Sequence, residues 1–319
     1  MDNESKQILQ ILKDNGIESL WHFTRIENLR LIKECNGLLS KKRLNERDLL
    51  EKVYFNGDSL SHYLDKREGN WNMVSLSFTP YNPMSYYKKK EHHLVFIEID
   101  PKVATFDGVY FTDCNATCSG QKREMGIRGL NNVRFFYVKC KPRPYDYKWK
   151  RYVQAEVLVP DYIPLYYFKK IHFISPASLE LGKHLWKEDS NIFTVTPNLF
   201  ADCRYCEIDY PYVINVVTTC QEVNKENAFN FDDDDPLLME GEVFWVKVYL
   251  YTKQNSKAKI NIRSGNGNIL YSVEETFDSS NLWSWHPSFR IPQNYRYSNI
   301  IIEVRLNDIL WYISRRMVI

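Results

Sequence analysis

Short runs of alternating hydrophobic and polar residues fill roughly the first 175 positions of the chain. Residues 5–14 repeat apolar side chains at helical spacing, which predicts a short amphipathic helix. Short segments with strand-like alternation follow at residues 20–23, 73–79, 94–99, 108–112 and 154–159. This pattern predicts a mixed α+β unit with short strands.

A second helix is expected directly after the first of these strands. Thr24 is a candidate N-cap, Glu27 stands three residues later as in a capping box, and Gly37 is a stop signal. Because helix N-termini attract phosphate, the turn at 24–28 is a candidate phosphate neighbour. Thr24 therefore has two open roles, capping this helix or contacting a bound ligand.

Beyond about residue 200 the pattern changes to regularly spaced short strands separated by Gly, Asn and Ser. The segment 265–268 (GNGN) joins two strand patterns and is typical of a hairpin turn. The expected strands are 243–252, 257–263, 268–277, 299–306 and 309–315. We therefore expect an antiparallel β-sandwich, with domains at 1–195 and 196–319.

Positive charge is concentrated in one segment, although the whole chain has a net charge of only +2. Residues 121–151 contain ten Lys and Arg residues against Glu124 and Asp146. Such a segment is either a phosphate-binding surface or an ordinary solvated loop. Its aromatic residues alternate with cations near the end, which suits a single nucleic-acid strand. The candidate nucleic-acid-binding residues are Arg123, Lys148, Trp149, Lys150 and Arg151.

The seven cysteines and the polar N-terminal residues favour a cytoplasmic protein with free thiols. Cys203 and Cys206 have the spacing of half a zinc site, but no second pair stands at ligand spacing, so we expect no metal. No apolar stretch approaches the ~20 residues that a membrane span needs, so we expect no membrane association. The nucleotide-binding motifs GxGxxG and the P-loop are absent from the sequence, as is HExxH, which disfavours a Rossmann-type dehydrogenase or a P-loop NTPase.

Four ordered segments carry a family resemblance. They are WHFT at 21–24 with GLLS at 37–40, FTPYNPMSY at 78–86, FTDCNA at 111–116 and QAEVLV at 154–159. In this order and spacing, residues 18–175 resemble the DarT family of toxin ADP-ribosyltransferases. The segment QAEVLV, followed by Ile163 and Pro164, is the most specific part. The C-terminal segment resembles no family that we can name.

The resemblance implies a transferase fold with a split central sheet and NAD bound as co-substrate in its cleft. It also implies a toxin that modifies bases of single-stranded DNA, or of RNA in some relatives. The implied partners are the nucleic-acid acceptor and an antitoxin, either a macrodomain hydrolase or an inhibitory protein. A toxin–antitoxin or phage-defence role follows from the same resemblance.

Glu156 is the expected catalytic residue, because it stands in the QAEVLV segment inside an apolar strand. Cleavage of the nicotinamide–ribose bond passes through an oxocarbenium-like sugar, which a carboxylate stabilises. A buried carboxylate costs stability unless it is paired or exposed at a site. Taken alone, Glu156 is better explained as a solvent-facing glutamate on an edge strand, and the ordered set of segments reverses this preference.

The resemblance extends to further candidate residues. His22, Thr24, Gly37 and Leu38 are expected to bind NAD, with His22 bonding a ribose or the amide. Tyr86 either stacks on nicotinamide or packs in the core.

Two further residues are expected near the reacting groups. Asn115 occupies the place where some relatives carry a histidine and is expected to orient the acceptor. The family's NAD-gripping arginine has no clean match; we assign it to Arg67, with Arg43, Arg47 and His62 as competitors.

Two other readings of the function stay open. One is an ADP-ribosyltransferase that modifies a protein, and the other is a binding module that keeps the fold without catalysis. The basic segment favours nucleic acid over protein, and the presence of both His22 and Glu156 disfavours a module without catalysis.

Overall fold

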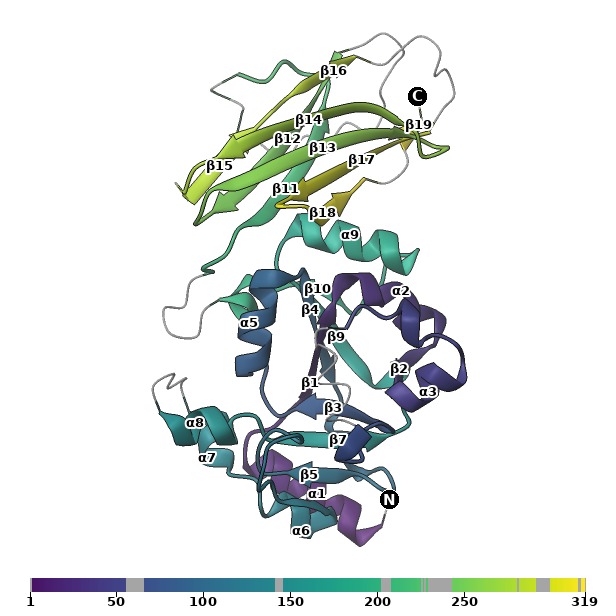
Figure 1. Ribbon diagram of the computed structural model, residues 1–319, viewed down its shortest axis with the longest axis vertical. Coiled ribbons are helices and arrows are strands. Elements are labelled where there is room, and N and C mark those ends of the chain that lie inside the picture. Colours follow the sequence, from purple (N-terminus) through teal and green to yellow (C-terminus); the bar gives the residue numbers. More distant parts are fainter. Residues whose placement is uncertain are drawn as a thin grey trace. The chain divides into compact units, whose positions relative to one another are not determined.

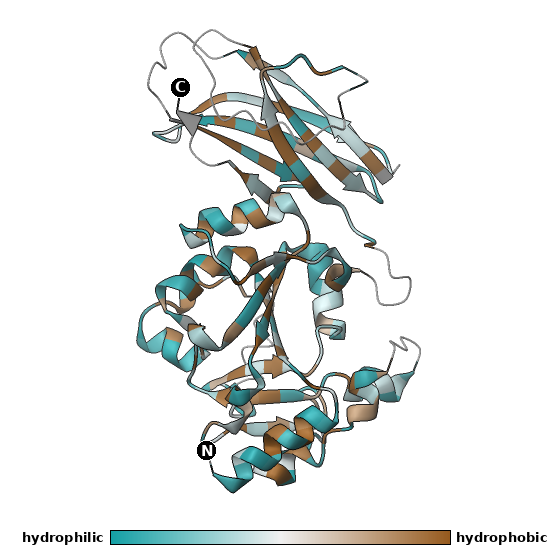
Figure 2. Cartoon of the chain, turned by 180° about the vertical axis from the view of Figure 1, so that it is seen from behind, coloured by the Kyte–Doolittle hydropathy of each residue, from teal (hydrophilic) through white to brown (hydrophobic). Residues whose placement is uncertain are grey.

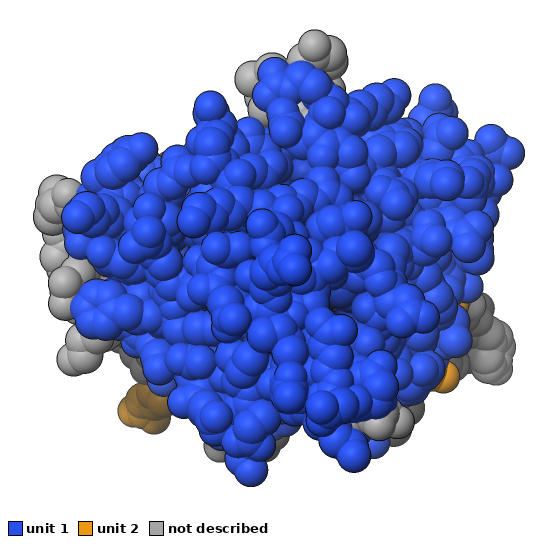
Figure 3. Space-filling model, turned by 90° about the horizontal axis from the view of Figure 1, so that it is seen from below, with its two compact units in different colours: residues 1–172, 190–194, 198–207 blue, residues 173–189, 195–197, 208–319 orange. Residues whose placement is uncertain are grey.

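The computed structural model of the chain describes residues 2–55, 66–140, 146–201, 208–224, 226, 228, 243–279, 281–290, 299–314 and 317–318. Contacts between residues group the chain into two units (Figure 3). The N-terminal unit comprises residues 1–172, 190–194 and 198–207, and the C-terminal unit comprises residues 173–189, 195–197 and 208–319. The two units alternate along the chain, so a single boundary at residue 195 stays a prediction.

An eight-stranded sheet, seven strands of which pair in an antiparallel manner, forms the centre of the N-terminal unit (Figure 1). Its order is β10-β9-β4-β1-β3-β7-β5-β6. The strands are β1 (Leu20–Arg25), β3 (Met73–Ser77), β4 (Leu94–Ile99), β5 (Tyr110–Thr112), β6 (Arg123–Met125), β7 (Glu156–Pro160), β9 (Phe168–Phe173) and β10 (Phe193–Val195). All five strands expected in this part of the sequence are present; 94–99 has the expected bounds, and the other four have shifted ends.

The sheet is split between β1 and β3. Strand β1 pairs with β4 along its whole length, but it meets β3 only where Trp21 faces Ser77. Figure 1 shows β1 and β4 running steeply across the direction of β3 and β7. The expected split-sheet α+β fold is therefore confirmed.

Short helices and one small two-stranded sheet surround the split sheet. The helices are α1 (Asn3–Asp14), η1 (Ile26–Asn28), α2 (Leu29–Glu34), α3 (Lys41–Glu46), η2 (Leu50–Lys52), α5 (Pro83–Glu91), η3 (Pro101–Thr105), α6 (Gly126–Leu130), α7 (Phe135–Lys139), α8 (Tyr147–Tyr152), η4 (Leu165–Tyr167) and η5 (Pro197–Phe200). The amphipathic pattern of α1 buries Ile8 and Leu12, as expected for its apolar side. Strand β2 (Gly37–Leu39) pairs with β8 (Tyr162–Pro164).

The expected capping box at Thr24 is wrong. Thr24 lies inside β1, and the helical turn begins at Ile26 with Arg25 at an N-cap that has no side-chain hydrogen bond. Glu27 instead pairs with Arg25 at 2.9 Å. Because the extended backbone of β1 continues through Thr24, the Thr24 hydroxyl is not placed to cap the helical turn.

The C-terminal unit contains two antiparallel sheets and one helix, α9 (Pro176–Trp186). One sheet contains β11 (Tyr212–Thr219), β12 (Val243–Thr252), β15 (Asn281–Trp285) and β16 (Ser288–Arg290). The other contains β13 (Ser256–Ser264), β14 (Ile269–Phe277), β17 (Asn299–Leu306), β18 (Ile309–Ile313) and β19 (Met317–Val318). Phe277 of β14 contacts the rings of Trp283 and Trp285 in β15, so the sheets pack face to face.

Alternating side chains build this sandwich, as the sequence predicted. Ala258, Ile260 and Ile262 of β13 are buried, and brown and teal residues alternate along the strands in Figure 2. The expected hairpin turn is present, since Ser264 accepts a bond from Gly267 and donates one to Asn268. Gly267 has a φ of +91°, a conformation that glycine adopts without strain.

Candidate active site

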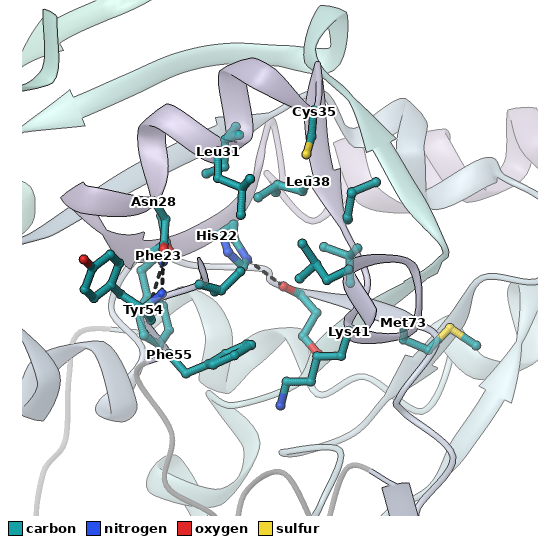
Figure 4. Close-up of a pocket in the computed structure, with 18 of the residues that line it drawn as sticks. His22, Phe23, Asn28, Leu31, Cys35, Leu38, Lys41, Tyr54, Phe55 and Met73 are labelled. Atoms are coloured by element: carbon teal, nitrogen blue, oxygen red, sulfur yellow. Dashed lines mark hydrogen bonds between the residues drawn. The ribbon is translucent and has the colours of Figure 1, made fainter. Parts of the chain in front are cut away.

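A pocket opens beside the split of the N-terminal sheet (Figure 4). Its walls come from β1, α2, β2, α3, residues 53–55 and β3, and its volume is about 280 Å³. This is at the small end of the range for small-molecule sites. Four expected NAD-binding residues line it together: His22, Thr24, Gly37 and Leu38.

His22 presents a neutral imidazole to this pocket. Its Nδ1 lies 3.1 Å from the backbone oxygen of Ser75 on β3. A carbonyl oxygen only accepts hydrogen bonds, so Nδ1 is the protonated nitrogen and Nε2 is the acceptor. Burial lowers the pKa of His22, and the bond to Ser75 opposes this shift. His22 is therefore an uncharged hydrogen-bond acceptor at neutral pH.

Asn28 fastens a wall of the pocket by three hydrogen bonds. Its Nδ2 donates to Thr24 Oγ1 and to the backbone oxygen of Tyr54, each at 2.9 Å. Its Oδ1 accepts from the backbone nitrogen of Tyr54 at 2.8 Å. The buried amide thus holds residues 53–55 against β1, and it explains why the Thr24 hydroxyl does not cap a helix. The sequence analysis overlooked Asn28, because an isolated asparagine carries no spacing signal.

Gly37 lies where β2 passes close to β8. A Cβ at this position would stand 2.1 Å from the backbone oxygen of Ile163, and the φ of Gly37 is +150°. No other residue fits this close approach. Glycine is thus required by the packing of the pocket wall, whatever the pocket binds, while the neighbouring Leu38 supplies a buried apolar surface.

Glu156 begins β7, one strand beyond β3. Its Oε2 accepts a hydrogen bond from the backbone nitrogen of Ala116 at 2.9 Å. Its own backbone nitrogen donates to Thr112 Oγ1 at 3.1 Å. Ser77 faces Glu156 across the β3–β7 pair and also faces Trp21 across the split. His22 and Glu156 are therefore carried by strands that both border β3.

The loop between β5 and β6 holds the Glu156 carboxylate and is itself tied down. Arg151 of α8 donates to Cys118 Sγ, to the backbone oxygen of Ser119 and to that of Gly120, at 3.2–3.3 Å. The Oδ1 of Asn115 accepts from the nitrogen and hydroxyl of Thr117. These bonds give Asn115 and Arg151 a role in building the loop, and their expected contacts with a nucleic acid stay predictions.

The three arginines considered for gripping NAD are exposed and do not line the pocket. Arg67 lies 2.7 Å from the Glu68 carboxylate. Arg43 pairs with Glu46 at 3.2 Å and with Asp161 at 3.5 Å. His62 lies outside the described residues. The assignment of Arg67 therefore finds no support in the pocket's geometry.

Tyr86 lies on α5 and does not line this pocket. Its ring contacts the side chains of Tyr87, Lys89 and Lys90. Stacking of Tyr86 on nicotinamide stays a prediction.

Burial divides the expected nucleic-acid-binding residues. Lys148 and Lys150 of α8 are exposed. Trp149 is only 4% exposed, so its ring faces cannot stack on a passing strand, and this expectation needs correction. Arg123 donates to the backbone oxygen of Glu68 and to Asn70 Oδ1 at 2.7 and 2.9 Å, which makes it an internal clamp.

Two aromatic rings are exposed on the short helices α7 and α8. Tyr147 of α8 is 74% exposed and Phe136 of α7 is 62% exposed. They supply the open ring faces that were expected of Trp149. We call Phe136, Tyr147, Lys148 and Lys150 the α7–α8 surface.

The described part of the chain contains no group of three or more His, Cys, Asp or Glu residues arranged to hold a metal ion. Cys203 and Cys206 lie outside the described residues. Among the helices that the structure describes, none is long and apolar enough to cross a membrane.

The split between β1 and β3 agrees with the transferase fold that the family resemblance implied. Residues 21–193 match the family model described as "ssDNA thymidine ADP-ribosyltransferase, DarT", and the chain belongs to this family. Membership confirms the resemblance. The family match does not cover the C-terminal sandwich.

Solved structures of the family resemble the chain. Thermosipho africanus DarTG in complex with ADP-ribose has 21% sequence identity and a TM-score of 0.48, covering 64% of this chain and 54% of that chain. Thermus sp. 2.9 DarT in complex with ADP-ribosylated ssDNA has 15% identity and a TM-score of 0.46, covering 58% and 96%. The chain thus spans about half the length of the Thermosipho protein. No curated protein sequence matches the chain.

Proposed function

We propose that this chain transfers ADP-ribose from NAD to a thymidine base of single-stranded DNA. The observation that carries the proposal is the placement of His22 and Glu156 on strands that both border β3, with His22 in the pocket and Glu156 held at the start of β7. The description of the family supports thymidine in single-stranded DNA as the acceptor.

The pocket residues fit one half of a dinucleotide. The Nε2 of His22 accepts a hydrogen bond from a ribose hydroxyl or from the carboxamide of NAD. Leu31 and Leu38 supply apolar surface for a ring. The Asn28 clamp keeps the segment 53–55 in place before the ligand arrives, which reduces the entropy lost on binding.

Glu156 acts on the ribose in this proposal. The bond between the ribose C1′ and nicotinamide breaks, and nicotinamide leaves with the electron pair. Positive charge develops on the sugar, and the carboxylate stabilises it through the ribose 2′-hydroxyl. The bond from Ala116 fixes one carboxylate oxygen, so the group is oriented before reaction. A nucleophilic atom of the base then bonds to C1′ and releases its proton to water.

The α7–α8 surface is the proposed path of the DNA strand. Two exposed rings and two exposed lysines lie within the segment 136–150. Aromatic faces stack on unpaired bases, and lysines neutralise phosphates, a combination that suits a single strand. Single-stranded RNA also has unpaired bases and phosphates. It is therefore the alternative acceptor that an experiment must distinguish from DNA.

The decisive experiment incubates the chain with labelled NAD in four parallel reactions. Each reaction contains one acceptor: single-stranded DNA, duplex DNA, RNA or total cell protein. We expect label on single-stranded DNA that contains thymine and none on an oligonucleotide that lacks it. Labelling of RNA alone would replace the acceptor, and labelling of protein alone would support the second reading of the sequence. No labelling and no nicotinamide release would support a binding module.

We also propose that the chain is a toxin whose mark an antitoxin removes or prevents. Expression in bacteria is then expected to arrest growth, and His22→Ala or Glu156→Ala is expected to relieve the arrest. An equally toxic double variant would show that the toxicity comes from another part of the chain.

A further inference from the structure

The pyrophosphate of NAD carries two negative charges, and the proposed function requires a cation to meet them. Charge-assisted hydrogen bonds to lysine or arginine are the strong contacts by which proteins hold phosphate groups. Among the described residues that line the pocket, Lys41 is the single lysine or arginine. Because His22 is neutral, Lys41 is also the one side chain among these residues that carries a positive charge at neutral pH.

Lys41 is placed by its neighbours before any ligand binds. Its Nζ lies 5.4 Å from the ring centre of Phe55 and 5.8 Å from that of Trp71. Such cation–π contacts hold an ammonium group by electrostatic attraction to the ring face. The next residue, Lys42, donates its backbone nitrogen to the oxygen of Trp71 at 2.8 Å, which fixes the start of α3 beside that ring.

The position of Lys41 in the pocket also suits a pyrophosphate. Figure 4 shows Lys41 and Phe55 on one side of His22, with Leu31 and Cys35 on the other. The pocket thus has an apolar end for a ring and a cationic end. A nucleotide has the same polarity, with an apolar base at one end and a charged phosphate at the other.

We propose that Lys41 binds the pyrophosphate of NAD and takes the part that the sequence analysis gave to Arg67. This inference rests on the proposed function, because it names the residue that recognises the phosphates in the same site. Arg67 is exposed and, unlike Lys41, does not line the pocket.

The test compares Lys41→Met with Lys66→Met. Lys66 is a matched control, because its Nζ lies 4.5 Å from the same Trp71 ring but the residue does not line the pocket. Binding of ADP-ribose and of adenosine, which lacks phosphate, is measured by calorimetry for each protein. We expect Lys41→Met to weaken ADP-ribose binding about 10- to 100-fold and adenosine binding less than about twofold. Lys66→Met is expected to change neither affinity.

Salt gives an independent readout. Raising ionic strength is expected to weaken ADP-ribose binding by the wild-type chain more than binding by Lys41→Met, because the variant has lost the screened interaction. Lys41→Arg is expected to recover most of the affinity. Both results would be absent if Lys41 only supported the pocket wall.

Three outcomes would overturn the inference. Equal ADP-ribose affinity for Lys41→Met and wild type would remove Lys41 from the phosphate site and leave the proposed function intact. An equal loss for adenosine and ADP-ribose would show damage to the pocket rather than loss of a phosphate contact. If the wild-type chain bound neither ADP-ribose nor NAD, the proposed function would fall together with this inference.

Discussion

The Glu156 carboxylate and the backbone nitrogen of Ala116 are joined by a hydrogen bond of 2.9 Å. This bond links the first residue of β7 to the loop between β5 and β6. Arg151 holds the same loop by its bonds to Ser119 and Gly120. The orientation of the proposed catalytic carboxylate therefore depends on a loop that α8 keeps in place.

Replacing Glu156 by glutamine is expected to remove the negative charge of the side chain and to keep its hydrogen bond from Ala116. The amide oxygen of glutamine still accepts the bond from Ala116, so the melting temperature should stay close to that of wild type. Loss of the charge should slow ADP-ribose transfer at least ~100-fold. Single-turnover transfer to a thymine-containing oligonucleotide measures the effect, with the exposed Glu124→Gln as control. Near-wild-type transfer by a folded Glu156→Gln would remove Glu156 from the reaction.

NAD binding should weaken at acidic pH because of His22. Burial lowers the pKa of His22 below its ordinary value of 6.5, so the imidazole is neutral at pH 7 and gains a proton only at a lower pH. Protonation turns the accepting Nε2 into a donor. The folded protein, which favours the neutral imidazole, therefore loses stability as the pH falls through the lowered pKa of His22. Calorimetric NAD affinity measured from pH 5 to pH 8 should fall at the acid end. The acid limb should be absent in His22→Gln; an identical pH profile for both proteins would assign it to another group.

Asn28→Asp should loosen the pocket wall while keeping the side chain's shape. An ionised aspartate has no donor for the oxygens of Thr24 and Tyr54, and it repels the Tyr54 carbonyl. We expect a loss of about 1–3 kcal/mol in unfolding free energy and a raised KM for NAD. Asn131→Asp, at an exposed position after α6, is the control for the added charge. If Asn28→Asp bound NAD with wild-type affinity, the clamp would have no role in forming the site.

Reversing two charges on the α7–α8 surface should weaken DNA binding without changing NAD hydrolysis. Lys148→Glu with Lys150→Glu is expected to weaken single-stranded DNA binding at least ~10-fold and to reduce its salt dependence. Hydrolysis of NAD without acceptor should stay nearly unchanged. The control is Lys6→Glu with Lys13→Glu, which makes the same charge change on exposed positions of α1. Equal losses in both activities would indicate a folding defect, and no loss in either would place the acceptor elsewhere.

The strands were the most predictable part of the fold. The predicted bounds of three strands equal the observed ones. These strands are β4 (94–99), β12 (243–252) and β17 (299–306). Burial of one face imposes alternation on a strand, and burial of both faces imposes a continuous apolar run. Helices α6, α7 and α8 were not predicted, because helices of five or six residues are too short to show a helical period.

Long-range contacts explain what the sequence analysis of the site got wrong or overlooked. Glu156 and His22 stand in recognisable segments, so both were predicted as site residues. The roles of Thr24 and Trp149 depend on what packs against them, which local sequence does not record. Lys41 resembles any surface lysine in the sequence, and its place in the pocket arises only when α3, Phe55 and Trp71 come together.

Because of helix α9, no cut at a single position in the sequence separates the two units. The helix lies between β9 and β10 in sequence, but it contacts β11 and β18, and Ser175 at its N-cap donates to the backbone oxygen of Val213. A gene fragment that ended near residue 195 would encode α9 without the strands that bury it, and the complementary fragment would encode a sandwich without its helix. The sandwich is thus interlaced with the transferase sequence rather than appended to it, and exchange of this unit alone requires a crossover on each side of α9 and a third before β11.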